Sequence, residues 1–566
     1  MKKLVNDPRH VVREMLEGLA DITPGIALLD REDVVIREDL PEPAQRPVAV
    51  ISGGGAGHEP AHAGYVGVGM LHAAVVGDVF TSPSVDAVLA AVQAVAGPAG
   101  VVLIVKNYTG DRLNFGLAAE LARSAGIPAE IVVVADDVAL RGTVEPGRRR
   151  GIAGTVLIHK IAGALAEAGA SLPEVAEAAR QAASAIGSMG VALGACTVPA
   201  AGTAGFSLAD DEIELGLGIH GEPGVQRTKL QPADPLVDLM LDAILEDRSI
   251  RSGDGVALLV NGLGGTPPME LAVVTRRALT TLRARGITVE RVWSGTLLSA
   301  LEMPGCSLSL LPVDPARLAH LDAATTAPAW PGSGVVPRAR VIRPASVPIV
   351  TQDRRNRSHD EAGAAVLAGA LAGASALEAR KRQLTDLDSA AGDGDLGISM
   401  ARGAAAIQAL SGNGAADAAS ALTRVAETLR RSIAGSSGPF YAVGLLRAAQ
   451  HLAASETLDA STWATAFERA VDAVAELGGA RPGDRTMLDA LYPAVAAFKA
   501  ALGRQADVAA AWADCVQAAE AGAAATARMR PRLGRASYLG DRVLGVQDAG
   551  AVAVTIWLRA LLTVVE

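Results

Sequence analysis

The chain has 566 residues, which is too long for one ordinary hydrophobic core, so we expect two or more domains. Hydrophobic residues make up 50% of the chain but aromatic residues only 3%, so the cores must be built mainly from Ala, Val, Leu and Ile. Helices and buried parallel strands suit that composition. The formal net charge of -10 argues against a nucleic-acid-binding protein, whose binding surface should be basic.

The cysteines and the chain ends indicate the compartment. Three cysteines, Cys196, Cys306 and Cys515, are far apart and odd in number, so we predict neither a disulfide framework nor a cysteine metal site. The first ten residues run into charged side chains, and the apolar C-terminal run is interrupted by Arg559. We therefore expect a cytoplasmic protein with no export signal and no membrane span.

The first half of the chain alternates short β-branched runs with longer alanine-rich ones, which predicts an α/β domain. The predicted buried strands are residues 47–52, 101–106, 130–135 and 256–262, and segments such as 115–126 are predicted as crossover helices. Beyond about residue 355, Ala, Leu, Glu and Arg recur at helical spacing. We therefore predict an α/β domain over 1–330, a Pro- and Gly-rich linker over 331–355 and an all-helical domain over 356–566.

Three motifs place polar side chains where strands of the first domain should end. GGGAGHEPAHAG follows the first strand, NYTGDRLNFG follows the second, and the alternating run EIELGLGIH ends at His220 before GEPG. The side chains delivered are His58, Asp111 and His220, and open α/β sheets bind ligands at the carboxyl ends of strands. Each residue alone fits a hydrogen-bonded structural role, but three together favour a site with acid–base or nucleophilic chemistry.

The segment HEPAH at 58–62 also matches the zinc-protease pattern H-E-x-x-H. That site needs both histidines on one helix face, whereas Pro60 and the preceding glycine loop place His58 before any helix. We therefore reject the protease interpretation and expect His62 to be an ordinary residue in the first turn of a helix.

The second domain contains an unusually acidic loop, DLDSAAGDGDLG at 386–397. The spacing fails the calcium loop pattern, which also needs a Glu at its twelfth position. Asp388, Asp393 and Asp395 instead predict a compact oxygen site for Mg²⁺, and a solvated turn with helix-capping aspartates is the structural alternative.

Gly- and Ser-rich turns at 435–441, 481–491 and 534–540 stand beside predicted helix starts, where backbone N–H groups can bind phosphate. No Walker A or protein-kinase glycine loop is present in the sequence, so a nucleotide site here must be of another design.

Taken together, GGGAGHEPAHAGYVG, FTSPSVDAVLAA, KNYTGDRLNFG, GLGIHGEPG, the aspartate loop, RPGDRTMLDAL and GRASYLG resemble the ATP-dependent dihydroxyacetone kinases in their single-chain form. The resemblance spans nearly the whole chain. It implies an N-terminal substrate domain and a C-terminal nucleotide domain built as a helical bundle or barrel. It also implies a homodimer that acts on a small ketose and ATP.

The resemblance further implies roles for individual residues. His220 adds to the substrate carbonyl to form a hemiaminal, Asp111 is the base for the attacking hydroxyl, and His58 is its hydrogen-bonding or acid–base partner. Asp388, Asp393 and Asp395 hold two Mg²⁺ ions that bridge the ATP phosphates. The implied substrate contacts are Gly53, Gly54, Gly55, Ala56, Gly57 and Lys106. The implied ATP contacts are Leu396, Gly397, Ser399, Ser436, Ser437, Gly479, Thr486, Met487, Arg535, Asp548 and Gly550.

Some positions depart from the family pattern. Ala56 replaces a common Ser, Leu396 replaces a frequent polar residue, and DAG at 548–550 replaces D-P-G. Two alternatives remain open. One is a kinase for another short ketose or aldose, such as erythrulose or glyceraldehyde, with a possible FAD-cyclising side activity. The other is a ketose-binding regulator without catalysis, against which the intact metal loop and the fused nucleotide domain argue.

Overall fold

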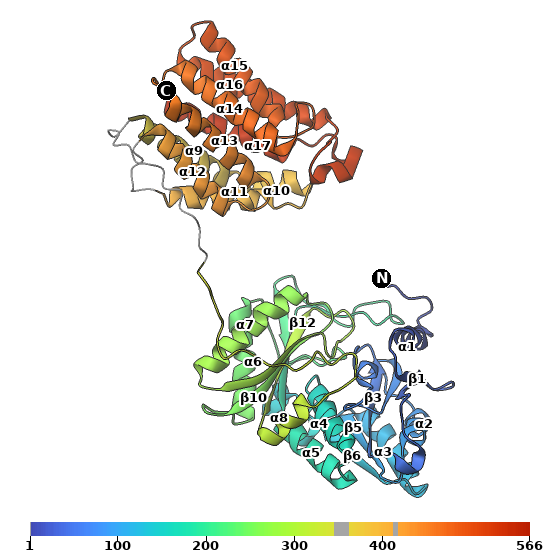
Figure 1. Cartoon of the computed structure of the whole chain (residues 1–566). Helices are drawn as coiled ribbons and strands as arrows, with labels where there is room; N and C mark the ends of the chain where they lie inside the picture. Colours follow the sequence, from blue (N-terminus) through green and yellow to red (C-terminus); the bar gives the residue numbers. More distant parts are fainter. Residues whose placement is uncertain (1, 345–360, 411–416, 566) are drawn as a thin grey trace. The chain divides into compact units, whose positions relative to one another are not determined.

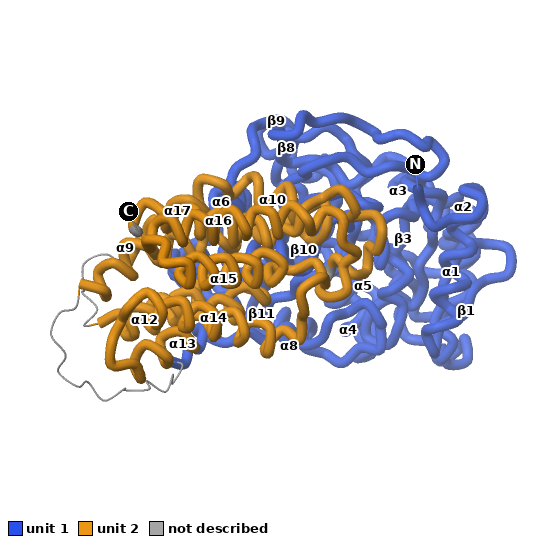
Figure 2. The backbone as a smooth tube through the Cα atoms, turned by 90° about the horizontal axis from the view of Figure 1, so that it is seen from above, with its two compact units in different colours: residues 1–344 blue, residues 345–566 orange. Residues whose placement is uncertain are grey.

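The computed structural model describes residues 2–344, 361–410 and 417–565, and it divides the chain into two compact units (Figure 1). The units are residues 1–344 and 345–566, coloured separately in Figure 2. This division falls inside the predicted linker, of which residues 345–355 lie outside the described residues. The first unit is α/β and the second is helical, as the sequence predicts.

The first sheet of the α/β unit has the strand order β1-β2-β4-β3-β5-β6. Strand β5 occupies the predicted range, and β3 and β6 overlap two further predicted strands. Side chains alternate along β5. Val101, Leu103 and Val105 pack with helices α2 (Val85–Val95) and α3 (Thr109–Ser124), whereas Val102 and Ile104 face α4 (Thr155–Glu167) and α5 (Leu172–Ala185). Burial on both faces explains the continuous β-branched run. The strands are β1 (Ile26–Leu28), β2 (Val34–Arg37), β3 (Ala49–Ala56), β4 (Ala73–Val79), β5 (Val101–Lys106) and β6 (Ala129–Val134).

The helices of this half connect and cover the first sheet. Helix α4 is buried along nearly its whole length, because its side chains share one core with residues of both sheets. The helices are α1 (Val11–Ile22), α2 (Val85–Val95), α3 (Thr109–Ser124), α4 (Thr155–Glu167) and α5 (Leu172–Ala185).

The second sheet has the order β11-β10-β12-β7-β8-β9, in which only β10 and β11 run parallel. One face of β10 packs on α6 and α7, and the other joins the core of the first sheet. The strands are β7 (Gly187–Ala192), β8 (Glu212–Leu215), β9 (Gln226–Lys229), β10 (Gly255–Gly262), β11 (Thr288–Gly295) and β12 (Gly305–Pro312). The helices are α6 (Ala233–Asp247), α7 (Pro268–Ala284) and α8 (Pro315–Asp322).

The described residues of the second unit form helices and no strand. Asp417, Asp459 and Asp507 accept backbone N–H bonds at the starts of α12, α14 and α16, which fixes where these helices begin. From α11 onward, consecutive helices pack against one another, and α17 also packs against α9. The helices are α9 (Glu361–Ala379), α10 (Lys381–Ser389), α11 (Leu396–Gln408), α12 (Ala418–Ser432), α13 (Ser437–Ala454), α14 (Ala460–Gly478), α15 (Leu488–Gly503), α16 (Val508–Ala525) and α17 (Ala549–Val565).

Helix α9 is apolar along its length. It is the one helix among the described residues that is long and apolar enough, by length and composition, to cross a membrane. In the structure it packs against α11, α12 and α17. One such helix is weak evidence for a membrane span, so the expectation of no membrane span stays a prediction.

Candidate active site

Two predicted histidines meet in the α/β unit. His58 follows the glycine loop at the end of β3, and its Nε2 lies 3.1 Å from Nε2 of His220. His58 is fully buried, with its ring stacked on Phe80 at 5.1 Å between centroids. Burial lowers the pKa of His58 well below its ordinary value, and the nearby charges of His220 and Lys106 lower it further. His58 is therefore a neutral imidazole.

The hydrogen-bond partners fix which nitrogens bear protons. His58 Nδ1 lies 2.8 Å from the Ser299 carbonyl oxygen, which only accepts, so Nδ1 donates and Nε2 keeps a lone pair. His220 Nδ1 lies 2.9 Å from Glu222 Oε1, a carboxylate oxygen that also only accepts. His220 therefore donates from Nδ1 to Glu222, and its Nε2 faces the Nε2 of His58 at 3.1 Å. The Tyr108 ring stands edge-on to the His220 ring at 4.6 Å between centroids.

Glu222, the carboxylate that orients His220, was not predicted from the sequence. Its Oε2 accepts the His220 backbone N–H at 2.9 Å, so one side chain holds both the ring and the backbone of the same residue. Burial alone would raise the pKa of Glu222, but the His220 hydrogen bond and charge, with backbone N–H groups, lower it to about 2. The signal in the sequence was the GEPG that follows His220.

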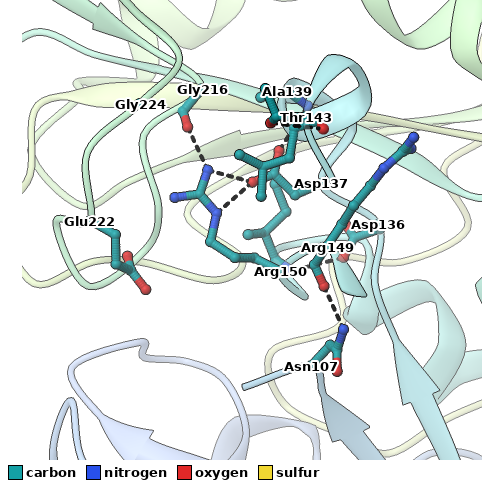
Figure 3. Close-up of polar contacts among 12 residues, drawn as sticks. Asn107, Asp136, Asp137, Ala139, Thr143, Arg149, Arg150, Gly216, Glu222 and Gly224 are labelled. Carbon is teal, nitrogen blue, oxygen red and sulfur yellow. Dashed lines mark hydrogen bonds and ion pairs between the residues drawn. The ribbon is translucent and has the colours of Figure 1, made fainter. Parts of the chain in front are cut away.

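The loop that bears His220 is held by Arg150. Its Nε donates to Asp137 Oδ2 at 2.8 Å and its Nη2 donates to the Gly216 carbonyl at 2.6 Å, as Figure 3 shows. Gly216 and Glu222 belong to the same loop as His220, between β8 and β9. Strand β8 ends at Leu215, so His220 lies on this loop and not directly at a strand end as the sequence suggested. Gly216 has φ +67, a left-handed conformation that interrupts the strand.

The glycine loop joins the histidine pair to a second pair of predicted residues. A Cβ on Gly54 would stand 2.6 Å from Lys106 Nζ and 3.7 Å from Asp111 Oδ2, so both groups border the same backbone position. Asp111 lies in the first turn of α3 and is 5% exposed. At the other end of the loop, a Cβ on Gly57 would stand 2.9 Å from the Phe80 ring that covers His58. The loop therefore borders Lys106 and Asp111 at one end and the histidines at the other.

His62 does not occupy the ordinary helical position that the sequence analysis expected, and that interpretation was wrong. Residues 58–62 form turns before a short 3-10 helix, Ala63–Tyr65, and His62 is 3% exposed. Its Nε2 lies 2.6 Å from Lys106 Nζ, whereas His58 faces His220. The two histidines of HEPAH thus have different partners, which agrees with the rejection of a zinc-protease site.

In the helical unit, the three predicted metal ligands come together. Asp388, Asp393 and Asp395 each offer one carboxylate oxygen, and these oxygens lie within 4.8 Å of one another. Asp395 stands at the start of α11 without making a side-chain capping bond, which argues against a capping role for it. Asp386 does not belong to this group, and its side chain is 71% exposed. Hard carboxylate oxygens at this spacing fit Mg²⁺.

The predicted ATP contacts lie around helix ends of the same unit. Gly550 lies beside Met487, and Asp548 is close enough to Asp388 and Arg485 for their charges to act on it. Burial raises the pKa of Asp548 to about 6. The remaining positions are Leu396, Gly397 and Ser399 at the start of α11, Ser436 and Ser437 at the start of α13, Gly479 at the end of α14, and Thr486 before α15. The side chain of Arg535 lies outside the described residues.

Comparison with known proteins identifies the family. The Dak1 domain model matches residues 17–329 and the DAK2 domain model matches residues 390–563. The chain belongs to the dihydroxyacetone kinase family. The solved dihydroxyacetone kinase of C. freundii is 35% identical to it, with a TM-score of 0.64 and 99% of each chain covered. The family resemblance predicted from the sequence motifs is therefore confirmed.

Relatives within the dihydroxyacetone kinase family are named for different activities. The triokinase/FMN cyclase of Homo sapiens is 44% identical, covering 100% of this chain and 99% of the relative. The D-erythrulose kinase of Mycolicibacterium smegmatis is 35% identical, covering 99% and 98%. The C. freundii enzyme has also been solved with AMP-PNP and Mg²⁺.

Proposed function

We propose that the chain transfers the γ-phosphoryl group of ATP to a hydroxyl of dihydroxyacetone that is bound covalently to His220. The observation that carries this proposal is the 3.1 Å contact between the Nε2 atoms of His58 and His220, with Glu222 on the opposite side of the His220 ring. His220, the proposed nucleophile, thus contacts the neutral base His58 at Nε2 and the Glu222 carboxylate at Nδ1. Family membership and the names of the relatives support a kinase for short sugars.

The histidine pair supports capture of a carbonyl without any net proton exchange with water. In this proposal a proton between the two Nε2 atoms moves to the lone pair of His58 Nε2, which leaves the His220 Nε2 lone pair to bond to the carbonyl carbon. The carbonyl π electrons move to oxygen, and His58 returns the proton to that oxygen. The product ring, bonded to carbon at Nε2 and to a proton at Nδ1, carries a positive charge beside the Glu222 carboxylate, which stabilises it.

Covalent capture also provides selectivity, because glycerol has similar hydroxyls but no carbonyl to accept His220. Phosphoryl transfer then requires removal of a proton from a hydroxyl of the captured ketose, which we assign to Asp111. The hydroxyl oxygen bonds to the γ-phosphorus as the bond to the bridging oxygen breaks, and ADP leaves. Mg²⁺ held by Asp388, Asp393 and Asp395 would neutralise phosphate charge in that step.

The second candidate is a kinase for another short sugar on the same site. Two relatives that match over the whole chain are named triokinase/FMN cyclase and D-erythrulose kinase, so erythrulose and glyceraldehyde are the competing substrates. FAD cyclisation is a further candidate activity for the same reason.

ADP release with Mg²⁺, ATP and a panel of dihydroxyacetone, D- and L-erythrulose, glyceraldehyde and glycerol tests the proposal. We expect the highest kcat/KM with dihydroxyacetone and none above background with glycerol. Preference for another ketose or aldose would support the second candidate, and no sugar-dependent ADP release would contradict kinase function.

A further inference from the structure

A chain of buried polar side chains runs from Ser52 on β3 to Lys106 at the end of β5. Lys106 Nζ lies 2.6 Å from His62 Nε2, His62 Nδ1 lies 3.5 Å from Ser52 Oγ, and Ser52 Oγ donates to the Ile104 carbonyl at 2.7 Å. Ser52, His62 and Lys106 are at most 3% exposed. Because buried polar groups must find partners inside the protein, each member constrains the next.

The donor and the acceptor of each hydrogen bond among these three side chains can be assigned by starting from Ser52. Ser52 uses its hydroxyl proton on the Ile104 carbonyl, so only a lone pair is left toward His62. His62 therefore has its proton on Nδ1 and a lone pair on Nε2, and Lys106 is the donor at 2.6 Å. Burial lowers the pKa of His62 well below its ordinary value, followed by the charge of Lys106, which agrees with a neutral ring that accepts.

The remaining N–H groups of Lys106 have a restricted choice of partners. An ammonium has three N–H groups; one is used on His62 and a second faces the Gly53 carbonyl oxygen at 3.4 Å. On the Gly54 side, Nζ and Asp111 Oδ2 border the same backbone position, since a Cβ on Gly54 would stand 2.6 Å from Nζ and 3.7 Å from Oδ2. The third N–H is thus available to a ligand oxygen that lies against Gly54 beside Asp111.

We propose that His62 is a positioning residue that aims the Lys106 ammonium at the substrate hydroxyl facing Asp111. In this arrangement Lys106 donates a hydrogen bond to the hydroxyl oxygen while Asp111 accepts its proton, so the oxygen is held where it can be deprotonated. Without the His62 acceptor, a buried and flexible lysine side chain would lose its fixed direction. This inference rests on the proposed ketose kinase function.

Two substitutions of His62, by side chains of similar length, separate the effect of the hydrogen-bond acceptor from the effect of side-chain volume. His62→Gln keeps a carbonyl oxygen near the place of Nε2, whereas His62→Met fills similar space without a strong acceptor. We expect His62→Met to raise KM for the ketose about tenfold, the effect of losing one hydrogen bond to a charged group, with KM for ATP unchanged. We expect His62→Gln to stay within about threefold of the wild type.

Two further variants distinguish positioning from loss of stability. His72→Gln changes another buried histidine of the same sheet, which accepts the Val50 N–H, and should lower Tm without changing the ketose KM. In the double variant Lys106→Met/His62→Met, the second substitution should add no further loss to that of Lys106→Met alone, because His62 acts through Lys106.

A wild-type KM for the His62→Met enzyme, equal impairment of the Gln and Met variants, or an additive double variant would each overturn the inference. Failure of the wild type to release ADP with any ketose would overturn the proposed function and this inference together.

Discussion

Replacement of Glu222 by Gln tests whether the Glu222 carboxylate holds His220 in position for the proposed reaction. Glu222 accepts the ring Nδ1–H and the backbone N–H of His220, both at 2.9 Å. Gln keeps one accepting oxygen, but its amide nitrogen can only donate, so one of these two bonds is lost together with the negative charge. The positive charge that the proposed carbonyl addition places on the His220 ring would then have no counter-charge.

The size of the expected loss in kcat/KM follows from the solvent exposure of the His220 and Glu222 side chains. A hydrogen bond to a charged group contributes about 1.5–3 kcal/mol. The His220 and Glu222 side chains are 20% and 34% exposed, so solvent screening places the effect at the lower end. About 1.5 kcal/mol corresponds to roughly a tenfold loss in kcat/KM for the ketose, and KM for ATP should not change.

The assay is ADP release at varied ketose, with adduct formation followed by carbon NMR of carbonyl-labelled dihydroxyacetone. Glu212→Gln is the matched control, because it removes the same charge from strand β8 without contacting His220. Unchanged capture in Glu222→Gln, or an equal loss in Glu212→Gln, would refute the role of the carboxylate.

Three further predictions concern other groups. Asp111→Asn should lower kcat by about 10²-fold while ketose binding persists, because the base is removed with little change of shape; steady-state kinetics check this, and an unchanged kcat would assign the proton to another acceptor. Asp388→Asn should weaken turnover about a hundredfold or more in an Mg²⁺ titration and leave ketose capture intact, whereas Asp386→Asn should be mild; the reverse order would overturn the metal assignment. His72 and His159 are buried with pKa values lowered to about 3, so both are neutral in the fold and take up protons on unfolding. Their stabilising contribution is complete above pH 6.5 and is lost as pH falls from 6.5 toward 3, by about 1.4 kcal/mol per pH unit for each histidine. Urea-unfolding midpoints at pH 7 and pH 5 measure this, and His159→Phe should flatten the dependence; an unchanged slope would contradict it.

Much of the fold could be predicted from the sequence because its cores follow simple periodicities. Strand β5 occupies the predicted residues 101–106, since a strand buried on both faces is a continuous β-branched run with clear ends. The helical nature of the second unit could also be predicted, because alanine-rich segments with leucine at helical spacing have no competing strand pattern.

Glu222 and the contact between His62 and Lys106 were not predicted from the sequence. They depend on where the chain reverses direction, which the spacing of hydrophobic residues does not show. Glu222 returns to its neighbour His220 only because the loop after β8 folds back on itself. His62 and Lys106 are 44 positions apart and meet through the pairing of separate strands. The motifs predicted which residues belong to the site, but the hydrogen-bond partners of each side chain depend on the tertiary structure.

Carbon NMR of carbonyl-labelled dihydroxyacetone with the wild type and His220→Ala tests the central claim most directly. The account predicts that the wild type converts the bound carbonyl signal into that of a tetrahedral carbon, and that His220→Ala shows only unmodified carbonyl. A tetrahedral signal that persists in His220→Ala, or is absent from a wild type that releases ADP with dihydroxyacetone, would contradict covalent capture at His220.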